Sequence, residues 1–328
     1  MLNPTDYPEV NTLLEAYLTA LQREFGDELL SVYLLGSLST GAYVPGWSDV
    51  NGVSVVRQGE PSQLGTRAQA ASLAALSAQP AWRKPPFSCC LPAAALNNTS
   101  WQNQPEGWGP AELSNLVEDG VLVWGEEIRD ELARPTLEQL RAYVLWKLAN
   151  LLQAPQLSLP LRMPRGGEWA YYHQHPTAVV DQLIYPTRVL LTWDTGRVGA
   201  KSEAVNHYIE EYHGPWEPVL LQADTIRRAG FYEALTPETV AFFAAQVPSL
   251  FEWVVKRLLS ILLLPDDMSQ AASAFRRWLA GQPQFSPAYQ GQPYDNLTPG
   301  ALGKRTRPTG PGEAGELFVP NRKPWLRP

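Results

Sequence analysis

The chain has 328 residues, of which 45% are hydrophobic, and a formal net charge of −7 at pH 7. This length allows two domains with real hydrophobic cores. The acidic balance argues against a general nucleic-acid-binding protein, because phosphate backbones are held by clustered lysine and arginine, but it suits a small cationic ligand.

We expect no signal peptide at the N-terminus. The first residues lack the basic and apolar regions of such a peptide. Residues 8–25 place apolar side chains at helical spacing and predict an amphipathic helix that ends at Gly26 and Asp27. An apolar strand follows over residues 29–36, and residues 48–56 alternate as a second strand after a Pro-Gly turn.

An alanine-rich helix is expected over residues 61–79, a third strand over 86–96 and a further short strand over 119–125. The third strand carries the only cysteines, Cys89 and Cys90. Neighbouring strand residues point to opposite faces, so a disulfide between them would be strained. Two free thiols are typical of a reducing cytosol, and we therefore expect a cytoplasmic protein. We expect no membrane partner, because no apolar run in the sequence is long enough to span a bilayer.

The second half predicts helices alone. Apolar residues recur with helical period over residues 135–154, 177–196, 201–212, 216–230, 236–263 and 267–281. Residues 283–328 are rich in proline and glycine and predict a loosely ordered tail. We expect an α/β domain with a small mixed sheet over 1–134, an all-α helical bundle over 135–282, and the tail over 283–328.

Residues 33–56 combine groups that suit phosphate and metal binding. Gly36 lets the backbone approach a phosphate closely, and Ser37, with the helix N-terminus expected behind it, offers hydrogen-bond donors. Asp49 stands near the start of the second strand, where alternate residues share a face. Two acids so placed could hold Mg²⁺ around a reacting phosphorus, but the residue two positions on is Asn51.

This segment resembles the nucleotidyltransferase superfamily, whose pattern is Gly-Ser, a spacer, then Asp-x-Asp or Asp-x-Glu. It is most similar to the adenylyltransferases that inactivate streptomycin and spectinomycin, which share the Gly-Ser and the Ser-Asp before the strand. The resemblance extends over roughly residues 10–260, and Arg188, Gly196, Lys201 and Ala204 match the helical C-terminal domain. It implies that Arg188 and Lys201 contact the ATP phosphates from across a cleft between the domains, and that Asp49 binds Mg²⁺.

The chain departs from this pattern at two acids. Asn51 replaces the second metal-binding acid, and residues 84–92, where the family carries its catalytic base, contain neither Asp nor Glu. The loop expected after the third strand could supply a substitute, and its acids are Glu106, Glu112, Glu118 and Asp119. Losing a positioned general base typically lowers a rate about 10²–10⁴-fold.

Each candidate residue also has a structural interpretation. Ser37 could cap a helix, Asp49 could stabilise a turn, and Arg188 and Lys201 could belong to a solvated helix end. Asp181 and Asp194 could attract a cationic substrate or could simply be polar helix surface. Two aromatic segments could line a ligand cleft or pack as surface loops, with His173 and His175 as loop residues rather than a metal pair; their aromatic residues are Trp101, Trp108, Trp169, Tyr171 and Tyr172.

Two functional hypotheses remain open. The first is a monomeric antibiotic-resistance enzyme that transfers AMP from Mg-ATP to a hydroxyl of a small, aminoglycoside-like acceptor. The second is a catalytically impaired protein of the same fold that binds nucleotide or ligand. Asn51 and the acid-free segment 84–92 separate the two hypotheses.

Overall fold

The computed structural model describes residues 4–80, 82, 86–97, 108–153 and 176–262. The chain divides into two compact units, Met1–Leu148 with Leu191–Ala200, and Ala149–Leu190 with Lys201–Pro328. Several predicted features lie outside the described residues: the helix over 267–281, the tail, Trp101, Glu106, Trp169, Tyr171, Tyr172, His173 and His175.

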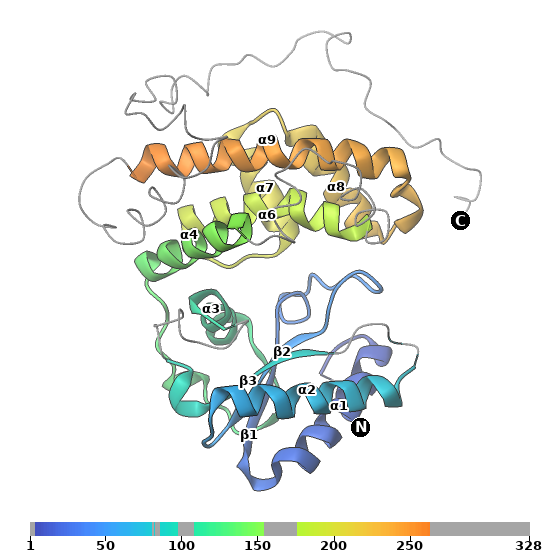
Figure 1. The fold of residues 1–328 in the computed structure, drawn as a ribbon, viewed down its shortest axis with the longest axis vertical. Coiled ribbons are helices and arrows are strands. Elements are labelled where there is room, and N and C mark those ends of the chain that lie inside the picture. The colour runs from blue at the N-terminus through green and yellow to red at the C-terminus, as the bar shows by residue number, and fades with distance from the viewer. Residues whose placement is uncertain (1–3, 81, 83–85, 98–107, 154–175, 263–328) are drawn as a thin grey trace. The chain divides into compact units, whose positions relative to one another are not determined.

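The first unit is built on a four-stranded mixed sheet with the order β3-β2-β1-β4 (Figure 1). Its strands are β1 (Leu29–Leu35), β2 (Asn51–Val56), β3 (Phe87–Pro92) and β4 (Val121–Gly125). β1 runs antiparallel to β2 and β4, whereas β2 and β3 are parallel. Parallel neighbours need a crossover connection, which α2 (Pro61–Ala78) provides here.

The sheet separates two hydrophobic cores. Helices α1 (Pro8–Phe25) and α2 bury their apolar faces against one side of it. On the other side lies α3 (Pro110–Asp119), which buries Leu113 and Leu116. Cys90 belongs to the first core and Cys89 to the second, and both thiols are free. The prediction that these neighbours point to opposite faces is confirmed.

Helix α3 corrects one expectation. Glu112, Glu118 and Asp119 lie on this helix rather than in a loop after the third strand. The sequence carries the signal, since a proline stands at the first helical position and apolar residues follow at helical spacing. A helix of ten residues is nevertheless short enough to be overlooked between a strand and a Gly-Pro-rich segment.

The remaining helices confirm the second half of the prediction. They are α4 (Leu137–Gln153), α6 (Pro176–Thr195), α7 (Lys201–Tyr212), α8 (Glu217–Ala229) and α9 (Pro237–Leu262). α4 begins with a capping box, in which the Gln139 backbone N–H donates to Thr136 Oγ1 at 3.2 Å and the Thr136 N–H donates to Gln139 Oε1 at 2.8 Å.

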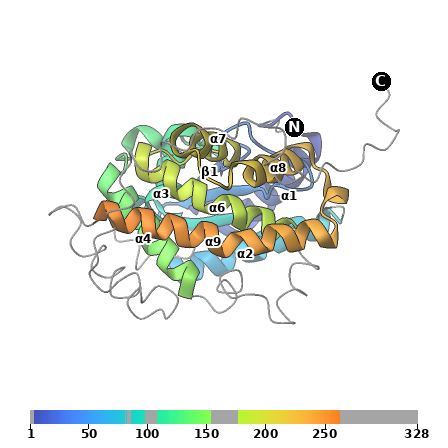
Figure 2. The same cartoon turned by 90° about the horizontal axis from the view of Figure 1, so that it is seen from above.

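Helix α6 continues through Pro186, although a proline removes one hydrogen bond of the helix. In the second unit it packs beside α9 (Figure 2). The rings of Tyr185 and Phe251 stack there with their centroids 6.3 Å apart. None of the helices in the described ranges combines the length and hydrophobicity that a membrane-spanning segment needs. The predicted class, a small mixed sheet with helices followed by an all-helical region, is confirmed.

Two glycine-to-alanine changes should affect stability in opposite directions. A Cβ at Gly52 of β2 would lie 2.5 Å from the Tyr33 carbonyl oxygen, whereas nothing lies within 4 Å of a Cβ at Gly65 in α2. We expect Gly52→Ala to lower the free energy of unfolding by about 1–3 kcal/mol through overpacking. Gly65→Ala should raise it by about 0.5–1 kcal/mol through helix propensity.

Urea unfolding of both variants measures this difference. Equal effects of the two changes would show that β1 and β2 do not approach each other as closely at Gly52 as the structure has them.

Candidate functional site

The turn after β1 is organised by Gly36. Its φ of +68° lies in the left-handed region that favours glycine. The Gly36 N–H donates to Asn115 Oδ1 of α3 at 2.6 Å, and the Gly36 carbonyl accepts from the N–H and the Oγ1 of Thr40, each at 3.0 Å. Gly36 is therefore tied both to α3 and to its own turn.

The expected helix behind Ser37 is absent. Residues 36–41 form turns, in which the Ala42 N–H donates to the Ser37 carbonyl at 2.8 Å. That prediction was wrong. The hydrogen bonds of the Thr40 and Ala42 N–H groups form local turns here and do not continue as a helix. Ser37 is half-buried, and any contribution it makes to phosphate binding comes from the turn itself and not from a helix dipole.

Gly36 and Asn51 lie next to each other. β1 and β2 pair Leu35 with Asn51, and a Cβ at Gly36 would stand 3.5 Å from Asn51 Nδ2. Asp49 is exposed and precedes β2, which begins at Asn51. The expectation that residues 49 and 51 share a strand face is therefore corrected, because residue 49 is not part of the ladder.

The residues around this turn suit Mg²⁺ in part. Asp49 offers a carboxylate and Asn51 an amide oxygen, and within the described ranges no three His, Cys, Asp or Glu side chains come together as a metal site. Mg²⁺ is commonly held by one or two carboxylates together with water and substrate phosphates. These residues would thus fit the ion only when phosphate oxygens complete its ligand set.

Glu112 is one of the acids considered as a replacement for the carboxylate that β3 lacks, and two neighbours hold its side chain. Glu112 accepts hydrogen bonds from Tyr143 Oη at 2.6 Å and from Lys147 Nζ at 2.7 Å. Burial, together with the charge of Glu112, raises the pKa of the Cys89 thiol to about 12. Glu112 therefore lies near β3, the strand that carries no acid of its own.

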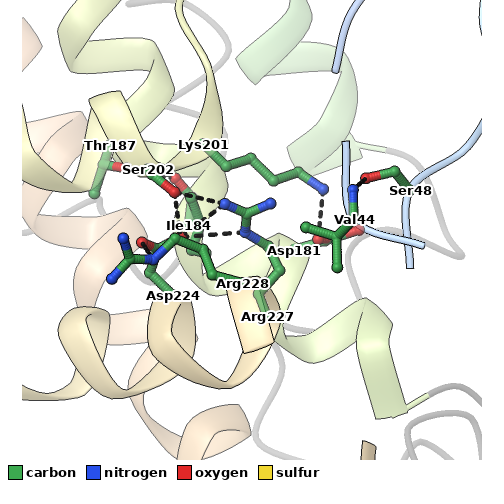
Figure 3. A network of polar contacts seen from close by, with 10 residues as sticks. All are labelled: Val44, Ser48, Asp181, Ile184, Thr187, Lys201, Ser202, Asp224, Arg227 and Arg228. Carbon is green, nitrogen blue, oxygen red and sulfur yellow. Dashed lines mark hydrogen bonds and ion pairs between the residues drawn. The ribbon is translucent and has the colours of Figure 1, made fainter. Parts of the chain in front are cut away.

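The second unit gathers positive charge at the start of α7. Lys201 is the first residue of this helix, and its Nζ lies 2.6 Å from Asp181 Oδ1 of α6 (Figure 3). Burial lowers the pKa of Lys201, the Asp181 carboxylate opposes this shift, and the charges of Arg188 and Arg227 lower the pKa further. The structure thus brings Arg188 and Lys201 into electrostatic range of each other.

A buried ion pair supports this charge cluster. Arg227 Nη2 lies 2.9 Å from Asp224 Oδ1, and both side chains are almost fully buried, at 4% and 6% exposure. Ser202 donates to Asp224 Oδ1 at 2.9 Å and accepts from Arg227 Nη2 at 2.6 Å, which joins α7 to α8 (Figure 3). Arg228 lies 3.2 Å from the other Asp224 oxygen. We did not predict this network from the sequence.

The structure also places three other residues that the sequence singled out. Trp108 is 3% exposed and belongs to the core beneath α3, so it is neither a ligand wall nor a surface loop residue. Asp181, considered as an attractor for a cationic substrate, is paired with Lys201. Asp194 is exposed near the end of α6.

Comparison with solved structures gives a likeness to an adenyltransferase. No family model and no curated protein matches the chain. The crystal structure of a spectinomycin adenyltransferase from Enterococcus faecialis with ATP and spectinomycin matches it with a TM-score of 0.46 and 15% sequence identity, over 75% of this chain and 99% of that chain. This likeness does not assign a family or a substrate to the protein.

Neighbouring arginines on α8 provide a matched test of the buried network. Arg227→Met should lower the free energy of unfolding by about 3 kcal/mol, because it leaves Asp224 buried without its closest cation. Arg228 is 63% exposed, and Arg228→Met should cost less than about 1 kcal/mol. Chemical unfolding of both variants measures the difference, and similar losses would contradict the buried position of Arg227.

Proposed function

We propose that this protein binds Mg-ATP and transfers AMP to a hydroxyl group of a small, aminoglycoside-like acceptor. The observation that carries the proposal is the positive charge around Lys201. The network described above contains four cations, Arg188, Lys201, Arg227 and Arg228, against the two carboxylates of Asp181 and Asp224. The first turn of α7 also carries Glu203, so that four cations stand against three carboxylates in this region. We infer that the remaining positive charge attracts an anion.

The chemistry of these side chains suits a triphosphate. Lys201 is a flexible cation at the N-terminus of α7, where the backbone also favours negative charge. Arg188 offers a planar guanidinium that can bind two phosphate oxygens at once. An incoming phosphate would compete with Asp181 for the Lys201 ammonium and would relieve repulsion among the cations.

The first unit would supply the remaining groups of the reaction. Asp49 would bind Mg²⁺, with the amide oxygen of Asn51 as a weaker neighbour, and Ser37 would donate to phosphate. Bound Mg²⁺ would neutralise charge on the phosphates during transfer. We also propose that the protein acts in the cytoplasm, since two buried free thiols suit a reducing compartment, and that it acts as a monomer.

A second candidate function is binding without turnover. Two observations support this hypothesis. Asn51 lies beside Gly36, where a carboxylate would complete a metal site, and β3 contains no Asp or Glu. The two functions differ in whether a nucleotide adduct of the acceptor forms.

Product analysis decides between these two functions. Purified protein is incubated with ATP, Mg²⁺ and either spectinomycin or streptomycin, and the acceptor is examined by mass spectrometry. The proposal predicts an AMP adduct of one acceptor together with released pyrophosphate. An unmodified acceptor at full binding of ATP would favour the binding protein.

Removing the ammonium of Lys201 should weaken ATP binding. Lys201→Ala loses a charge-assisted contact, and we expect the dissociation constant for ATP to rise at least several-fold, by about 1–2 kcal/mol. Lys256→Ala is the matched control, because Lys256 lies in the same unit and is paired with Glu252 one helical turn away. Titration calorimetry measures both variants, and an unchanged constant in Lys201→Ala would remove Lys201 from the phosphate site.

Restoring an acid at residue 51 should raise the rate of transfer. Asn51→Asp would place a second carboxylate beside the Gly36 turn, so that both the transfer rate and its dependence on Mg²⁺ should increase. We expect a partial gain, since β3 still provides no acid. Steady-state pyrophosphate release measures the effect. A wild-type rate typical of enzymes that Asn51→Asp leaves unchanged would show that Asn51 is not a defect.

A further inference from the structure

We propose that Glu112 of α3 is the general base that accepts the proton of the acceptor hydroxyl. This inference rests on the transfer reaction proposed above. It assigns to a helix the role that β3, without an Asp or Glu, cannot fill.

Helix α3 lies against the Gly36 turn. Asn115 accepts the hydrogen bond of the Gly36 N–H at 2.6 Å. Glu112 precedes Asn115 by three residues, and side chains three apart are neighbours on one face of a helix. The face of α3 that holds the turn therefore also carries the Glu112 carboxylate.

Glu112 also lies near β3. Its charge acts on Cys89, which pairs with Val53 in the sheet, and Val53 is two residues beyond Asn51. Gly36 and Asn51 are themselves neighbours. The helix of Glu112 thus contacts the Gly36 turn, and the charge of Glu112 reaches β3, the strand beside β2.

Two hydrogen bonds fix the Glu112 carboxylate and leave acceptor positions for a substrate hydroxyl. Each oxygen accepts one hydrogen bond, Oε2 from Tyr143 and Oε1 from Lys147, whereas an ionised carboxylate has about four acceptor positions. The Tyr143 ring packs so closely on the backbone of Gly109 that a Cβ there would lie 2.4 Å from it. The Glu112 side chain is 24% exposed, so a substrate hydroxyl can reach it.

The other acids of α3 are held differently. Asp119 accepts a hydrogen bond from the amide of Asn115 at 3.3 Å, longer than the contacts of 2.6 and 2.7 Å that fix the Glu112 carboxylate. Glu118 is exposed and lies six residues after Glu112, so that it points from a different part of the helix surface. Glu118 therefore serves as the matched control.

The proposed step balances as follows. The acceptor hydroxyl oxygen attacks the α-phosphorus of ATP and forms a new phosphorus–oxygen bond, while its proton passes to Glu112. The bond between the α-phosphorus and the oxygen bridging to the β-phosphorus breaks, and pyrophosphate leaves with the electron pair. Glu112 then releases the proton to water.

Steady-state kinetics and ATP titration test this role together. Glu112→Gln keeps the size of the side chain and removes the base, so kcat with spectinomycin or streptomycin should fall by about 10²–10⁴-fold. The dissociation constant for ATP should stay within about twofold, as expected for a group that acts on the acceptor and not on nucleotide binding. Glu118→Gln should leave both quantities near the wild-type values.

Each outcome separates this inference from the function on which it rests. A Glu112→Gln protein that transfers AMP at the wild-type rate overturns the role of Glu112 and leaves the transferase intact. A wild type that binds ATP but transfers nothing to either probe overturns both. If Glu112→Gln does not fold, Glu112→Asp is measured instead; it keeps the charge for Lys147 but withdraws the carboxylate, and an unchanged kcat would overturn the proposal.

Discussion

Positive charge around Lys201 is the constraint on which the proposed function depends. The ammonium is partly buried, is paired with Asp181 at 2.6 Å, and has its pKa lowered by burial and by the charges of Arg188 and Arg227. Arg227 cannot move away, because its guanidinium is buried with Asp224 and hydrogen-bonded to Ser202. Like charges held together in this way are stabilised by an anion, and this is the physical basis of the proposed preference for a phosphate-containing ligand.

In the first unit, amide side chains and not charged ones surround the turn after β1. Asn115 holds the Gly36 N–H, and Asn51 lies beside the same glycine. An amide can orient a turn but cannot take up a proton, and it binds Mg²⁺ more weakly than a carboxylate. Acids outside the strands, Asp49 before β2 and Glu112 and Asp119 of α3, are therefore the candidates for metal binding and proton transfer at this end of the sheet.

The periodicity of apolar residues was sufficient to predict most of the fold. It located the strands and the long helices because each has a buried face, and it placed Cys89 and Cys90 on opposite sides of the sheet. It failed where structure depends on local turns: Gly36 and Gly41, with φ of +68° and +69°, enclose a turn and not the helix expected after Ser37. The pair of Asp224 with Arg227 was missed because its burial depends on Ser202, which comes from another helix.

Titration of the wild-type protein with ATP, with and without Mg²⁺, tests the central claim most directly. The account predicts saturable binding of one ATP per chain that tightens when Mg²⁺ is added and weakens with salt, because charge around Lys201 supplies the attraction and Asp49 the metal contact. Absence of binding under both conditions, or binding that responds neither to Mg²⁺ nor to salt, would contradict it.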